Sequence, residues 1–135
     1  MAKSKGDTDR LLQRRGCAAK FQNAFRGIAL GVRGESSFYV QITAALAVVA
    51  LGWLLRMTRL EWGLLVLCIT SVLVAEMFNS ALETLAKAVD TRYNPQVGKS
   101  LDISSAAVLL SSAGAAIVGT MLFAYRLGIA LGWWV

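Results

Sequence analysis

Histidine is absent from this 135-residue sequence, and proline and cysteine are scarce, with one and two residues respectively. The absence of histidine removes the commonest general base and most zinc sites. The two cysteines, Cys17 and Cys68, stand 51 positions apart and form neither a CxxC pair nor a metal-binding spacing. The first 35 residues are charged and lack a short apolar segment near the start, so we expect no signal peptide.

Charge is also scarce: charged residues make up 16% of the chain, against about 25% in a typical soluble domain, whereas hydrophobic residues make up 56%. The hydrophobic residues concentrate in three runs, at 38–55, 62–82 and 103–125, whose one charged residue is Glu76. A helix of about 20 apolar residues crosses the roughly 30 Å hydrocarbon core of a membrane. We therefore predict transmembrane helices at about 37–56, 61–87 and 103–125. A soluble bundle is the alternative, but these runs would offer no polar face to water.

The residues before the first run predict a different kind of helix. Residues 1–14 are polar and basic, and we expect them to be mobile. From about 16 to 34, apolar residues recur at helical spacing with polar residues between them; the apolar positions are Phe21, Ala24, Phe25, Ile28 and Ala29. This pattern is typical of an amphipathic helix on a membrane surface. The predicted fold is therefore an all-α membrane protein, with one domain over residues 15–135 that joins a surface helix to three transmembrane helices.

Positive charge is unevenly distributed around the predicted spans. The chain has 14 Lys and Arg against 8 Asp and Glu, a net charge of +6. Nucleic acid binding is one reason for such a balance, but the basic residues flank the spans and membrane topology explains them better, so we expect no nucleic-acid partner. Eleven lie before the first span or between the second and third, and three lie on the opposite side. The positive-inside rule then predicts a cytoplasmic N-terminus.

The third run is rich in small residues: Ala107, Ser111, Ala115 and Gly119 recur every four positions. Small residues at this spacing let helices approach closely in lipid. Three helices enclose little volume by themselves, so we expect the protein to be a homo-oligomer.

The polar residues of the second run are the most informative feature. Glu76, Asn79, Ser80 and Glu83 lie at positions i, i+3, i+4 and i+7 and share one stripe of a helix, which Lys87 extends. A carboxylate inside a span is costly and is by default a functional hypothesis. Glu83 alone is also compatible with a residue at the membrane interface, but Glu76 lies roughly 10 Å deeper by helical rise.

Carboxylate and amide oxygens bind hard cations such as Mg²⁺. A single helix supplies ligands from one side, so other segments must contribute. Glu35 precedes the first span and Asp102 opens the third, and the predicted topology places both near the same cytoplasmic interface as Glu83. Acids from three segments are therefore expected to converge there.

Basic residues near these acids indicate a phosphate ligand. Lys99 and Arg92 lie in the loop that leads to Asp102. Acids and cations at the boundary between water and lipid suit a reaction between a water-soluble phosphate donor and a lipid acceptor, in which Mg²⁺ neutralises charge on the phosphates. Glu76, the most deeply placed acid, is suited to accept a hydroxyl proton. The sequence has no Walker A motif, no glycine-rich kinase loop and no HRD or DFG motif, so soluble kinase folds are excluded.

The segment Glu76-Met-Phe-Asn79-Ser80-Ala81-Leu82-Glu83 resembles the E-x-x-N-[ST]-A-[IL]-E signature of the small bacterial integral-membrane lipid kinases, the prokaryotic diacylglycerol and undecaprenol kinases. Asp102 and the small residues after it look like the second motif of that family, and 23–28 with Glu35 is similar to its surface-helix segment. Glu61-Trp62 and Tyr93-Asn94-Pro95 are closer to the undecaprenol type. The resemblance covers residues 15–125.

The resemblance implies a homotrimer in the bacterial inner membrane, with active sites shared between neighbouring subunits. It also implies Mg-ATP as phosphate donor and a lipid hydroxyl as acceptor, with diacylglycerol and undecaprenol both open. Its site residues, carried over by position, are Glu35 and Glu83 for the metal, Glu76 as base, Asn79 as a metal or phosphate ligand and Asp102 for the nucleotide. Besides these, we predict that Ser80 contacts the lipid together with Glu76, and that Lys87, Lys99 and Arg26 bind phosphate.

The sequence departs from the family pattern at two positions. Leu101 stands where the family usually has Lys, and Lys87 stands where it usually has Asp. We interpret this as an exchange, in which Lys87 or Lys99 supplies the phosphate contact that position 101 lacks. The rival interpretation is drift after loss of catalysis, which would leave a membrane protein that binds lipid or acts as a scaffold. A third hypothesis is an ion-conducting oligomer with Glu76 as a pore ring, against which the interfacial acids Glu35 and Asp102 count.

Overall fold

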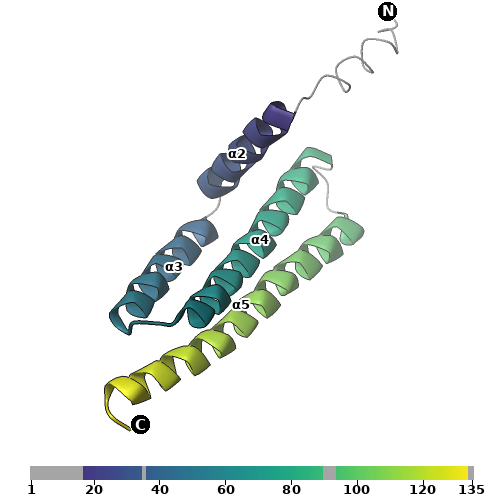
Figure 1. The fold of residues 1–135 in the computed structure, drawn as a ribbon. Coiled ribbons are helices and arrows are strands. Elements are labelled where there is room, and N and C mark those ends of the chain that lie inside the picture. The colour runs from purple at the N-terminus through teal and green to yellow at the C-terminus, as the bar shows by residue number, and fades with distance from the viewer. Residues whose placement is uncertain (1–16, 35, 90–93, 134–135) are drawn as a thin grey trace, which may run out of the picture.

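The computed structural model describes residues 17–34, 36–89 and 94–133 (Figure 1). These residues form four α-helices and no strand: α2 (Cys17–Gly34), α3 (Ser36–Leu54), α4 (Arg59–Val89) and α5 (Pro95–Ala130). The prediction of an all-α protein is confirmed. Some residues with sequence-based predictions lie outside the described residues: 1–14, Glu35 and Arg92.

Three of the helices, α3, α4 and α5, are long and apolar enough to cross a membrane. They run antiparallel in chain order, and α4 is central because it packs against α2, α3 and α5 (Figure 1). In Figure 1, α2 and α3 lie end to end along about the same direction. Its last turn contacts α4, since a side chain at Gly31 would meet Met77 at 3.8 Å.

Burial in this chain is the reverse of that in a water-soluble protein. The buried side chains include the polar residues Glu61, Glu76, Ser80 and Ser104, whereas large apolar residues such as Leu46, Leu67 and Leu110 are exposed. Water would penalise an apolar surface of this extent. Lipid instead solvates apolar side chains and forces polar groups to find partners inside the protein.

The turn between α3 and α4 is held by backbone geometry. Arg56 adopts a left-handed conformation with φ of 52°. Its N–H donates to the carbonyl of Trp53 at 3.1 Å, and the N–H of Met57 donates to that of Gly52 at 3.2 Å. This pair of bonds is a Schellman motif, which ends α3 and reverses the chain. A side chain at Gly52 would approach the sulfur of Met57 to 3.1 Å, so glycine lets the turn fold back on the helix.

α5 extends beyond the apolar run at both ends, since the run occupies only 103–125 of a helix that begins at Pro95. Asn94 caps it: the side-chain Oδ1 accepts a hydrogen bond from the N–H of Gln96 at 3.0 Å. Pro95 occupies the first helical position, where its missing N–H leaves no bond unmade. The Asn-Pro pair therefore starts a helix here, and α5 carries Lys99 and Asp102 in its first turns.

Candidate functional site

The buried acid Glu76 on α4 is held from a second helix. Its side chain is 4% exposed. The Nε2 amide of Gln41, on α3, donates a hydrogen bond to its Oε2 at 3.0 Å. A carboxylate accepts hydrogen bonds and does not donate them, so the amide nitrogen of Gln41 must face it. Two spans therefore meet at this acid.

Asn79 links α4 to both Glu83 and α5. Its Nδ2 donates to Oε1 of Glu83 at 2.9 Å, and its Oδ1 accepts a hydrogen bond from the hydroxyl of Ser104 at 2.6 Å. Ser105 lies further away, with its hydroxyl 3.4 Å from the same oxygen. Ser104 is buried, and its Oγ also lies 2.9 Å from the carbonyl oxygen of Leu101, which shares the single hydroxyl proton. The network orients Asn79 so that its nitrogen supports the carboxylate of Glu83.

Ser80 lies one turn from Glu76 on the same stripe and is 6% exposed. Its hydroxyl has no hydrogen-bond partner among the described residues, and neither does Oε1 of Gln41. A buried polar atom without a partner destabilises the fold and calls for an explanation, of which a functional role is one. Both orphan atoms belong to residues that adjoin Glu76, by hydrogen bond in one case and by helical spacing in the other.

Lys87 ends the stripe. Its Nζ is 3.9 Å from Oε2 of Glu83, and its side chain is 75% exposed against 29% for Glu83. Lys99 and Asp102 are exposed on α5, and Arg26 is exposed on α2. In the described parts of the chain no hydrogen bond or ion pair joins these three to the α4 stripe. The structure thus brings together Glu76, Asn79, Ser80, Glu83 and Lys87, to which it adds Gln41 and Ser104.

The described residues contain no group of three acids, cysteines or histidines that would hold a metal ion by itself. The donor set nonetheless fits Mg²⁺, because Mg²⁺ usually takes one or two carboxylates together with substrate phosphates and water. Glu83 is the half-buried carboxylate of the stripe. It lies next to the exposed Lys87, at the end of the stripe that is open to the surface. Glu35, the second predicted ligand, lies outside the described residues.

An apolar groove of about 720 Å³ runs along the bundle between α3, α4 and α5. Its walls are aliphatic and small side chains, among them Ala44, Val72 and Ala115. Gln41 also lines it, so the groove adjoins the residue that holds Glu76. Such a groove can accommodate a hydrocarbon chain.

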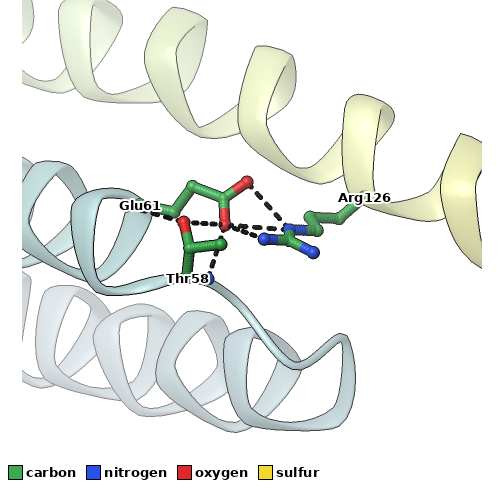
Figure 2. A network of polar contacts seen from close by, with 3 residues as sticks. All are labelled: Thr58, Glu61 and Arg126. Carbon is green, nitrogen blue, oxygen red and sulfur yellow. Dashed lines mark hydrogen bonds and ion pairs between the residues drawn. The ribbon is translucent and has the colours of Figure 1, made fainter.

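A second polar cluster, Thr58, Glu61 and Arg126, lies at the opposite end of α4 (Figure 2). The hydroxyl and N–H of Thr58 donate to Oε2 of Glu61 at 2.7 and 2.6 Å, which caps the start of α4. The guanidinium of Arg126 on α5 donates hydrogen bonds to the same carboxylate. Its Nε lies 2.8 Å from both carboxylate oxygens, and its Nη2 donates to Oε2. Glu61 is buried, the side chain of Arg126 is 15% exposed, and their hydrogen bonds form a clamp between α4 and α5.

Sequence reasoning missed the pairing of Glu61 with Arg126, as well as Gln41 and Ser104. The Thr-x-x-Glu spacing of Thr58 and Glu61 is a capping-box signal that identifies one half of the clamp. Nothing in the spacing of Gln41 or Ser104 marks them, because each acts through a residue on another helix.

These features define a class: a multi-pass membrane protein with a buried network of acid and amide groups between its spans. Residues 22–123 match the family described as Prokaryotic diacylglycerol kinase. This chain belongs to that family of membrane lipid kinases, as the sequence resemblance predicted.

Two relatives illustrate the similarity. The chain is 28% identical over 107 residues to the Undecaprenol kinase of Bacillus subtilis (strain 168), which is 79% of this chain and 87% of that protein. It is 39% identical over 77 residues to the Diacylglycerol kinase of Helicobacter pylori (strain ATCC 700392 / 26695), which is 56% of this chain and 59% of that protein.

Proposed function

We propose that this chain is an Mg²⁺- and ATP-dependent lipid kinase that phosphorylates the hydroxyl of a lipid alcohol at the cytoplasmic face of a bacterial inner membrane. The observation that carries the proposal is the buried carboxylate of Glu76, which the amide of Gln41 holds at 3.0 Å beside an apolar groove. Family membership supports the same reaction class. Diacylglycerol and undecaprenol, named for the relatives, are the acceptors to compare.

In the proposed reaction the lipid chain occupies the groove and the hydroxyl reaches Glu76. Glu76 accepts the hydroxyl proton while the lipid oxygen bonds to the γ-phosphorus of ATP. The bond from that phosphorus to the β–γ bridging oxygen breaks, so ADP leaves with the electron pair and the lipid becomes a phosphate ester. Burial strengthens the interaction between base and hydroxyl, because the surroundings have a low dielectric constant.

The phosphates are proposed to lie at the end of the stripe marked by Glu83. Glu83 and Glu35 would hold Mg²⁺, which supplies positive charge to offset that of the phosphates. Asn79 supports Glu83 through its amide nitrogen, and the hydroxyl of Ser104 fixes the orientation of that amide. The chain's own contribution is therefore mainly position, which dominates catalysis of phosphoryl transfer.

We also propose a homotrimer with a cytoplasmic N-terminus and with α2 on the membrane surface. Gly114 on α5 has open space where a side chain would be, so a neighbouring copy can approach there closely. On α2, Phe21 and Phe25 are exposed beside the exposed Lys20 and Arg26, the arrangement that an interfacial helix requires.

One assay tests the function. Purified protein in mixed micelles receives labelled ATP and Mg²⁺ with either diacylglycerol or undecaprenol. We expect label in one lipid and none when Mg²⁺ is chelated. No labelled lipid with either acceptor would refute the proposal.

The contact between Lys87 and Glu83 favours a second candidate. Lys87 Nζ lies 3.9 Å from this carboxylate and would compete with Mg²⁺ for it. Loss of Mg²⁺ there would leave a family member that binds lipid without turnover. This candidate predicts that the protein binds lipid but transfers no phosphate. The lipid kinase remains the proposal, because the buried acid and its supporting network are intact.

Lys87 and Lys99 separate the two candidates further. If either lysine supplies a phosphate contact, replacing it with alanine raises the KM for ATP by about 5- to 30-fold, as expected for a charged hydrogen bond worth about 1–2 kcal/mol. If Lys87 instead blocks Glu83, Lys87→Ala lowers the Mg²⁺ concentration that gives half-maximal activity. Full retention of activity and of both constants in the two variants would remove the proposed exchange.

Ser104→Ala tests the support of Asn79. We expect kcat to fall about tenfold, because the freed amide of Asn79 no longer holds Glu83 and a misplaced group of this kind slows the reaction. Ser105→Ala is the matched control: its hydroxyl is exposed and 3.4 Å from the same oxygen, so activity stays near that of the wild type. Equal loss in both variants would contradict the assigned role of Ser104.

A further inference from the structure

Gln41 is an amide placed on the wall of an apolar groove. Its neighbours there on α3 include Val40, Ala44 and Ala45. An apolar side chain would pack at this position without leaving a buried acceptor unpaired, whereas Oε1 of Gln41 has no partner among the described residues. Packing alone therefore does not account for an amide here.

The contact that Gln41 makes supplies another reason for it. Its Nε2 donates to Oε2 of Glu76 at 3.0 Å, and the two residues come from different spans, 35 positions apart. A glutamate side chain has three rotatable bonds, and the buried position of Glu76 excludes the water that would otherwise solvate its carboxylate. A hydrogen bond from a neutral amide to a buried carboxylate is strong and directional. Gln41 thereby restricts where the carboxylate points.

We propose that Gln41 is a positioning residue for Glu76. It holds the carboxylate in the orientation from which Glu76 accepts the proton of a lipid hydroxyl, beside the groove that Gln41 itself lines. This inference rests on the proposed lipid kinase function and assigns α3 a part in the reaction that the α4 stripe by itself does not show.

The first test compares Gln41→Met with the wild-type enzyme in mixed micelles. Methionine has a similar length and no donor. We expect kcat to fall about 10- to 100-fold while the KM values for ATP and lipid stay within about twofold, because positioning of the base acts on the transition state and not on substrate binding. Thr43→Val is the matched control on α3, since its exposed hydroxyl donates only to the carbonyl of Tyr39 in its own helix, at 2.8 Å.

The second test is a double-mutant cycle. If Gln41 acts through Glu76, adding Gln41→Met to Glu76→Gln lowers the remaining activity by less than about twofold. Gln41→Asn, which keeps the amide but withdraws it by one methylene, is expected to lose kcat as well, and it serves where the methionine variant does not fold. Independent, multiplicative losses would show a role that does not pass through Glu76.

The outcomes separate this inference from the proposed function. A wild-type enzyme that phosphorylates lipid, together with variants at position 41 that retain full kcat, would overturn the role of Gln41 and leave the kinase standing. A wild-type protein that labels no lipid would overturn both.

Discussion

Glu76→Gln is expected to lower lipid phosphorylation by about 100- to 10,000-fold, the range that a general base contributes. Glutamine has the same shape and can still accept a hydrogen bond from Gln41, so the helices remain packed. It cannot take up the hydroxyl proton, so the chemical step loses its base. Initial rates with labelled ATP at saturating lipid measure the effect.

Ser71→Ala is a matched control for Glu76→Gln. Ser71 lies on the same helix and is exposed, away from the network around Glu76. A Glu76→Gln enzyme within about tenfold of the wild type would contradict the role of base. The pore hypothesis gives a different result, because it predicts ion flux in liposomes that depends on Glu76 and not on ATP.

Breaking the clamp at the other end of α4 is expected to have the largest effect on stability. Glu61→Gln or Arg126→Met leaves one charge of a largely buried ion pair without its partner. Loss of these hydrogen bonds to a charged group is expected to lower the free energy of unfolding by about 1.5–3 kcal/mol. Unfolding of the purified protein in detergent, followed by circular dichroism against denaturant, measures the change.

A double variant that lacks both partners shows whether the loss of stability in the single variants comes from the charge that is left unpaired. Glu61→Leu with Arg126→Leu removes both charges and is expected to be more stable than either single variant, because neither charge is then left unpaired. It still loses the cap on Thr58, which costs about 1 kcal/mol. Arg59→Ala is the control: Arg59 is exposed next to the clamp, and its loss is expected to change stability by less than about 0.5 kcal/mol. Single variants as stable as the wild type would refute the clamp.

The clamp and the site are expected to behave independently. Glu61 and Glu76 are 15 residues apart on one helix, about 22 Å by helical rise. Activity per folded molecule of a clamp variant therefore stays near that of the wild type, whereas Glu76→Gln loses activity without losing stability. The charged group at one end of α4 therefore serves stability, and the one nearer its other end serves the reaction.

Helix number and the α4 stripe could be predicted because both depend on local sequence. An uncharged run of about 20 residues in lipid must satisfy its backbone within a helix. Residues at i, i+3, i+4 and i+7 then share a face by helical geometry alone, which places Glu76 and Glu83 together. The start of α5 was less evident, since Asn94-Pro95 is typical of both a turn and a helix cap.

What could not be predicted comes from contacts between helices. Gln41 lies in an uncharged run, and Ser104 is one of several hydroxyls on α5; neither position stands out until a packed bundle brings it to α4. Arg126 is one of the three basic residues that the charge distribution places on the side opposite the N-terminus, and the sequence gives it no partner. In the structure Glu61 neutralises it, so its charge serves helix packing.

The amino-acid sequence by itself determined that the chain forms apolar helices of membrane-spanning length and that one of them carries acids on a single face, because hydrogen bonding within a helix and its 3.6-residue period are local properties. The tertiary structure alone decided which residues hold those acids. The rotation and register of α3 and α5 against α4 bring Gln41 to Glu76, Ser104 to Asn79 and Arg126 to Glu61, and they depend on the packing of side chains that are distant in the sequence.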